Sequence, residues 1–121
     1  MKIKKVKIGI KSVKEVLDDF VKTGEAIERG KKVKKQTGVY FTSLEAFRKV
    51  LTPKRLELLH IIKTQKPESI NKLARTAKRD VKNVADDVKY LEQVGLVDKK
   101  EGRRESILTV KYDEIELKIA V

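Results

Sequence analysis

The sequence contains no cysteine and no tryptophan, and it has one histidine and two prolines among its 121 residues. Without cysteine there is neither a disulfide nor a thiolate metal site, and His60 alone cannot form a histidine-rich metal site. No apolar run approaches the roughly 20 residues that span a bilayer, and the N-terminal residues lack the apolar core of a signal peptide. We therefore expect a cytoplasmic protein that does not enter a membrane.

Signals of catalysis are also missing. The sequence has no glycine-rich phosphate loop, no metal-ligand spacing and no nucleophile elbow. Its two Asp-Asp pairs, Asp18-Asp19 and Asp86-Asp87, consist of neighbours in expected helices, whose side chains diverge and cannot form a carboxylate dyad. We expect that the protein is not an enzyme and needs no cofactor.

Positive charge is in excess, because 30 lysines and arginines against 18 acidic residues give a net charge of +12. Such a balance favours a polyanionic partner such as DNA or RNA. Aromatic residues make up only 5% of the chain, which is few for a protein that stacks single-stranded bases. The abundance of lysine and glutamate is typical of thermophile proteins.

The stretch from Ser69 to Val97 predicts two short helices joined by a tight turn. Ser69 stands where an N-cap should, and Asp80 can cap the second helix. Gly95 supplies a left-handed residue that ends it. Apolar residues recur at helical spacing in both segments: Ile70, Leu73, Ala74 and Ala77, then Val81, Val84, Ala85, Val88 and Leu91. This pattern is typical of a helix-turn-helix.

Two expected strands follow, at residues 96–99 and 106–112, with a basic turn at 100–105 between them. A hairpin directly after a recognition-type helix is the wing of a winged helix-turn-helix. The last residues then alternate strictly, with Ile115, Leu117, Ile119 and Val121 on one face. They predict a further strand, which pairs either with the N-terminal strand or with a second subunit.

The first 36 residues predict a basic strand–helix extension and a candidate dimerisation arm, followed by the winged-helix domain at 37–121. Alternation within residues 2–11 predicts a strand, and Ser12 with Glu15 forms a capping box for a helix that ends at Gly30. Thr42 or Ser43, and then Thr52, should cap two more helices that bury Leu44 and Leu56. We thus expect an α+β winged helix-turn-helix with an N-terminal strand–helix extension and a C-terminal strand.

Candidate DNA contacts lie on the recognition helix, about residues 80–94, and on the wing, about 99–105. Arg and Lys can reach guanine or phosphate, and Asn can read adenine. A carboxylate such as Asp86 suits cytosine N4 better than phosphate, and a solvated helix face is the alternative for this whole set. The candidates are Arg79, Lys82, Asn83, Asp86, Lys89, Tyr90, Lys99, Lys100, Arg103 and Arg104.

Four segments resemble one family: FTSLEAFRKVLTPKRLELL, PESINKLAR, DVKNVADDVKYLEQVGLV and VKYDEIEL. They are similar to winged-helix transcriptional regulators of archaea and bacteria, akin to the MarR and ArsR groups and sometimes described as antitoxin-like. The resemblance implies a cytoplasmic, dimeric regulator of double-stranded DNA, with Lys82 and Asn83 at the helix start used for DNA. The chain departs from the family at Ala85 and Asp86, where basic or histidine residues are common.

Two alternatives remain open at the level of sequence. A winged helix can be a protein-interaction module, such as an antitoxin, with Asp86 and Asp87 as contacts for a basic partner. The chain could instead bind DNA or RNA non-specifically through the lysines of the arm, including the cluster Lys31, Lys32, Lys34 and Lys35.

Overall fold

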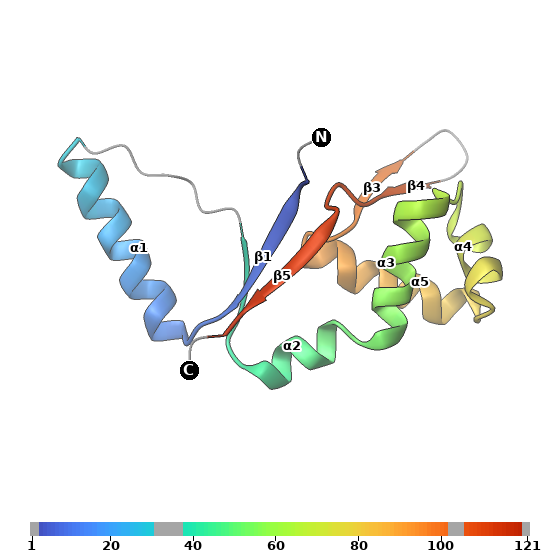
Figure 1. The fold of residues 1–121 in the computed structure, drawn as a ribbon, viewed down its shortest axis with the longest axis horizontal. Coiled ribbons are helices and arrows are strands. Elements are labelled where there is room, and N and C mark those ends of the chain that lie inside the picture. Colours follow the sequence, from blue (N-terminus) through green and yellow to red (C-terminus); the bar gives the residue numbers. More distant parts are fainter. Residues whose placement is uncertain (1–2, 31–37, 102–105, 120–121) are drawn as a thin grey trace.

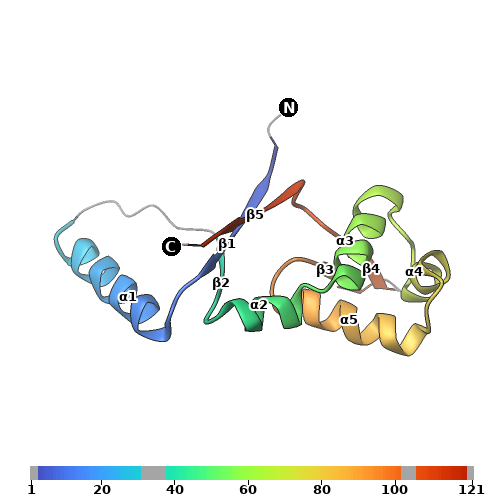
Figure 2. The same cartoon turned by 60° about the horizontal axis from the view of Figure 1, so that its bottom comes forward.

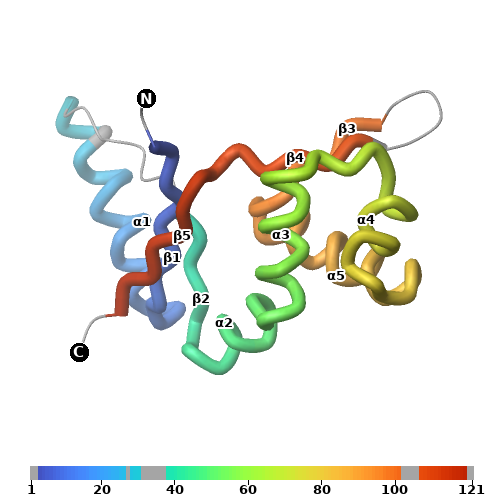
Figure 3. The backbone as a smooth tube through the Cα atoms, turned by 45° about the vertical axis from the view of Figure 1, so that its right-hand side comes forward, coloured from blue at the N-terminus to red at the C-terminus, as the bar shows by residue number. Residues whose placement is uncertain are grey.

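The computed structural model describes residues 3–30, 38–101 and 106–119, which form five helices and five strands. A three-stranded sheet lies between the projecting helix α1 and the helices α3 to α5 (Figures 1 and 3). In chain order, the elements are β1 (Lys5–Ile10), α1 (Val13–Glu28), β2 (Gly38–Phe41), α2 (Leu44–Val50), α3 (Pro53–Gln65), α4 (Ile70–Ala77), α5 (Val81–Gln93), β3 (Asp98–Glu101), β4 (Ser106–Thr109) and β5 (Glu114–Lys118). The α+β winged-helix prediction is confirmed.

The sheet is parallel, and β1 occupies its centre between β2 and β5. Val6 and Ile8 are buried in the core as their alternation predicts, and Ile8 is paired with Val39 on β2 and Leu117 on β5. Of the two partners left open for the C-terminal strand, the N-terminal strand is the one it pairs with within the chain. The division at residue 36 stays a prediction, and β1 is hydrogen-bonded to strands from beyond it.

Helix α1 projects away from the winged helix (Figures 1 and 2). Its predicted N-cap is confirmed, since the backbone N–H of Glu15 donates to Ser12 Oγ at 3.2 Å. Lys11, just before the helix, contacts both the helix and β2. Its Nζ lies 2.6 Å from an Asp19 carboxylate oxygen and 4.6 Å from the centre of the Tyr40 ring. The apolar stripe of the helix is exposed, and its members are Val13, Val16, Leu17, Phe20 and Val21.

The core joins the sheet to α3, α4 and α5, and α3 contributes the buried residues Leu58, Leu59, Ile61 and Ile62. The expected burial of Leu56 and Leu44 is wrong, because they are 45% and 40% exposed. At 100° per residue, Leu56 lies about 140° from the middle of the buried face of α3. The apolar face of this sequence is wider than the face that the core covers.

Hydrogen bonds at the helix ends confirm most of the predicted caps. Ser43, Thr52 and Ser69 each accept a backbone N–H from the first turn of the helix that follows. Asp80 occupies the N-cap position of α5, but its side chain makes no capping bond. The turn before it is closed by Lys78 in the left-handed conformation, at φ 56°.

The end of α5 and the wing follow the prediction with two differences, one of which is that β4 ends at Thr109, three residues earlier than expected. Gly95 has φ 81°, and the N–H of Leu96 donates to the carbonyl of Leu91 at 2.9 Å, which closes a Schellman motif. Leu96 and Val97 are buried behind this turn, so β3 starts at Asp98, two residues later than expected. Lys100 therefore lies in a strand, opposite Ile107 on β4, and not in the turn.

Candidate nucleic-acid interface

The buried side of α5 fixes which residues the helix presents to solvent. Val84, Val88 and Leu91 are buried against the rest of the domain. At 100° per residue, the opposite side carries four exposed residues, Lys82, Asp86, Lys89 and Gln93. Asn83 and Tyr90 are exposed too, but they lie toward one flank of this face. The outward side of α5 therefore also includes Gln93, which the sequence analysis did not single out.

Further cations lie on the elements around α5. Figures 1 and 2 place α4, α5 and the strands β3 and β4 at the end of the molecule remote from α1. The exposed cations on α4, the following turn and β3 are Lys72, Arg75, Lys78, Lys99 and Lys100. Sequence reasoning missed the three that precede Arg79, although they occupy positions off the apolar stripe of α4. Arg103 and Arg104 lie outside the described residues.

Asp86 sits among the cations of α5 and is exposed. It forms no ion pair with Lys82, Lys89 or any other residue that the structure describes. A carboxylate in this position repels phosphates unless it accepts a hydrogen bond from a base. If this face binds DNA, removal of the Asp86 carboxylate should change the affinity in a direction that can be measured.

Asp87, the neighbour of Asp86, is partly buried between two arginines, with 14% of its side chain exposed. Arg79 Nη2 donates to one carboxylate oxygen at 2.7 Å, and Arg55 Nε donates to the other at 3.0 Å. Burial raises the pKa of Asp87, but the hydrogen bonds and charges of Arg79 and Arg55 outweigh it, so the pKa lies below the ordinary 3.8. The side chain of Arg79 is only 19% exposed, and its Nη1 is buried with no described hydrogen-bond partner. This internal pair accounts for Arg79 without any DNA contact.

Arg55 connects three helices. Its Nη1 donates to the carbonyls of Lys49 and Val50 at 2.8 and 2.9 Å, at the end of α2. Its guanidinium carbon also lies 4.5 Å from the centre of the Tyr90 ring on α5. Tyr90 therefore contacts α3, which is an alternative reason for its position. The sequence signal for this cluster was the place of Asp87 on the buried side of α5, because a buried carboxylate requires a donor.

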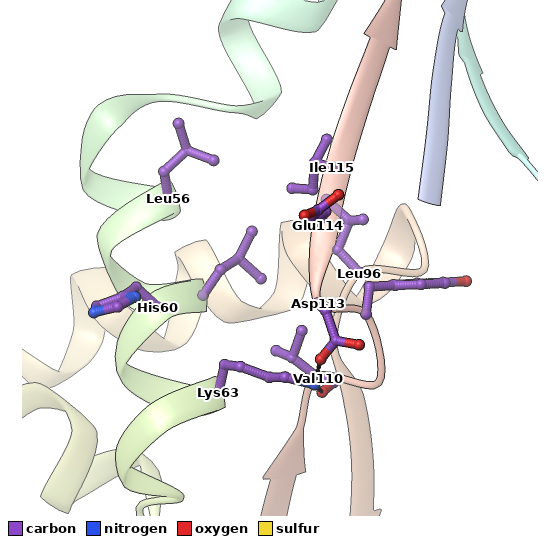
Figure 4. A pocket seen from close by; sticks show the side chains of 10 residues that line it. Leu56, His60, Lys63, Leu96, Val110, Asp113, Glu114 and Ile115 are labelled. Carbon is purple, nitrogen blue, oxygen red and sulfur yellow. Dashed lines mark hydrogen bonds and ion pairs between the residues drawn. The ribbon is translucent and has the colours of Figure 1, made fainter. Parts of the chain in front are cut away.

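A groove separates α3 from β5 and encloses about 210 Å³. Figure 4 shows Leu56 and Ile115 on its opposite sides. Lys63 Nζ lies 3.1 Å from Asp113, and the backbone N–H of Lys4 donates to the same carboxylate at 2.9 Å. The backbone N–H of Lys4 and the ammonium of Lys63 together lower the pKa of Asp113. The enclosed volume is below the roughly 300 Å³ at which pockets for small molecules begin.

Neither a metal site nor a membrane span occurs in the described part of the chain. Those residues contain no group of three or more His, Asp or Glu side chains that could hold a metal ion. They also include no helix long and apolar enough to cross a membrane.

Comparison with known proteins gave a matching family and likenesses among solved structures. The family described as HVO_A0114 matches residues 50–117, which run from the end of α2 through β5. No curated protein matches the chain significantly. Among solved structures, the multiple antibiotic-resistance repressor (MarR) from Listeria monocytogenes 4b F2365 is 20% identical, with a TM-score of 0.47, over 85% of this chain and 67% of that one.

Proposed function

The chain belongs to the HVO_A0114 family, and we propose that it is a dimeric regulator of transcription that binds a specific sequence of double-stranded DNA. One observation carries the proposal. The outward face of α5 lies at the same end of a winged helix as the hairpin β3–β4, and exposed cations occur on α4, α5 and β3. This is the arrangement in which other winged helices place one helix in the major groove and a hairpin on the backbone.

In the proposed complex, the start of α5 enters the major groove. Lys82 reaches guanine or phosphate, Asn83 reads adenine, and Asp86 accepts from cytosine N4. Phosphate contacts come from Lys89 and the cations of α4. On the wing they come from Lys99 and Lys100, together with Arg103 and Arg104. A dimer then reads two half-sites about 34 Å apart, one turn of DNA.

Two observations favour this function over its alternatives. Asp87 is 14% exposed and already paired with two arginines, so it is not available to a basic protein partner. The residues of α1 include five acidic and only two basic side chains, which makes the described helix of the arm unsuited to a polyanion. We propose no catalytic activity for the protein and place it in the cytoplasm.

The proposal is tested by fluorescence anisotropy with the DNA upstream of the protein's own gene. A scrambled duplex is measured beside it, both across a salt series. A preference of about 10³-fold for the native fragment is expected of a specific regulator. Equal binding with a steep salt dependence would reduce the function to polyanion affinity. Absence of binding to either duplex at low salt would contradict the proposal.

A separate prediction concerns the wing. Replacing Arg103 and Arg104 by alanine should weaken binding to every duplex and reduce the slope of log K against log salt by about 2, because each phosphate contact contributes about 0.9. The control, Arg48→Ala with Lys49→Ala, removes the same charge from α2 and should leave the slope almost unchanged. A wing variant that behaves like this control would exclude the wing from the interface.

A further inference from the structure

The outer edge of β5 is unpaired within the part of the chain that the structure describes. β5 is hydrogen-bonded to β1 on one side, and the strand order β2-β1-β5 leaves its other side open. All five of its residues are exposed. An open edge presents backbone N–H and C=O groups to any strand that can align with them. We propose that a second copy of the chain pairs there, β5 against β5 and antiparallel, to form one six-stranded sheet.

Apolar side chains on β5 give this pairing a driving force. Ile115 and Leu117 are paired with Val6 and Ile8 of β1, so they lie on the face of the sheet that packs on the core. Unlike those two residues, Ile115, Leu117 and the following Ile119 are 37%, 40% and 48% exposed. The apolar residues of β5 therefore extend the core-facing side of the sheet beyond the part that the core covers. A second copy would cover the row and the open side of the groove in Figure 4.

The charges of β5 select a second copy as the occupant, and they select one register. With Leu117 opposite its own counterpart, Ile115 lies opposite the partner's Ile119, and Glu116 lies opposite the partner's Lys118. The two-fold axis repeats each of these contacts, so the apolar pair and the charged pair both occur twice in the dimer. A slip of one residue sets Leu117 against a charge. A slip of two sets Glu116 or Lys118 against its own counterpart.

This edge also carries little of the positive charge that makes two copies of the whole chain repel each other. The whole chain carries +12, whereas β5 has two acidic residues and one basic. Helix α1 also has a large exposed apolar stripe. It carries five acidic and two basic residues, so two copies of α1 packed against each other would repel. The inference rests on the proposed dimer and is independent of DNA binding.

The first test is the mass of the full chain in solution, by analytical ultracentrifugation across a concentration series. The wild type should sediment as a dimer of 13.9 kDa chains. Leu117→Lys should raise the dimer dissociation constant on the order of 100-fold, because it sets two ammonium groups against each other at the two-fold axis. Ile107→Lys, which changes a 51% exposed residue of β4, is the matched control and should remain dimeric.

Cysteine cross-linking tests the register without weakening the fold. The chain has no cysteine of its own, so one introduced thiol per chain gives an unambiguous product. Leu117→Cys should form a covalent dimer on mild oxidation. Lys118→Cys should not, because two residues of offset carry the Cα atoms beyond the roughly 7 Å that a disulfide spans.

Two results would overturn the inference. A monomeric wild type that still binds DNA would remove both the β5 pairing and the dimer, and leave DNA binding in place. A dimer that survives Leu117→Lys and fails to cross-link through Leu117→Cys would remove the pairing alone. Loss of that dimer in Phe20→Lys would then assign the interface to the exposed stripe of α1.

Discussion

Replacing Asp87 by alanine is expected to lower the free energy of unfolding by about 3 kcal/mol, the lower end of the range for breaking a buried ion pair. Arg55 and Arg79 would remain mostly buried beside each other, at 13% and 19% exposure, without the carboxylate that now accepts from both. At constant pH, urea titration followed by circular dichroism measures the loss. Asp86→Ala is the matched control, since it removes the neighbouring exposed carboxylate and should change stability by less than about 0.5 kcal/mol.

The pH dependence of the same contribution follows from the pKa of Asp87. Because the pKa in the folded protein lies below 3.8, the ionised carboxylate stabilises the fold at every pH above the unfolded value. The stability gap between wild type and Asp87→Asn should therefore be constant from neutral pH down to about 5 and should narrow below about 4. A gap that persists undiminished at the lowest pH would mean that side-chain shape, and not the ion pair, is responsible.

Features that depend on neighbouring residues were predictable from the sequence. Ser69 and Thr52 cap helices because a hydroxyl accepts from an N–H three residues on, and Gly95 ends α5 because the turn requires a positive φ. The hairpin after α5 was also predictable, because its two strands and the turn between them are adjacent in the sequence. Local signals alone thus place α5 and the start of the wing to within two residues.

Features that depend on distant residues were not predictable. The spacing of Val13 to Val21 identifies an apolar face of α1 but does not say what covers it, and Leu56 fits a helical stripe without being buried. The alternation in residues 115–119 predicts a strand, but it does not say whether this strand pairs with the N-terminal strand or with a second subunit. Arg55 and Asp87 are 32 positions apart, and no local pattern connects them. The sequence therefore includes Arg79 and Tyr90 in the candidate DNA surface, because their internal partners are visible only in the fold.

Replacing Lys82 and Lys89 together by alanine is expected to weaken DNA binding about 60-fold at 0.1 M salt, if each lysine neutralises one phosphate with a salt exponent of about 0.9. Both lysines are exposed on the outward side of α5, so their removal should leave the core intact. The slope of log K against log salt should fall by about 1.8 in the same anisotropy series. Arg48→Ala with Lys49→Ala on α2 again removes two charges away from the proposed surface, and it should change neither quantity appreciably.

Asp86→Asn gives the complementary test, because it should act in the opposite direction. If α5 faces the DNA backbone, removal of this carboxylate eliminates a repulsion from phosphates and should raise affinity for all duplexes several-fold. If Asp86 also accepts from cytosine N4, the preference for the native fragment should fall at one base pair, by about 1–3 kcal/mol. If neither the double lysine variant nor Asp86→Asn changes the affinity for DNA, the proposal that this face of α5 contacts DNA is contradicted. The exposed carboxylate would then be better explained as a contact for a basic protein partner.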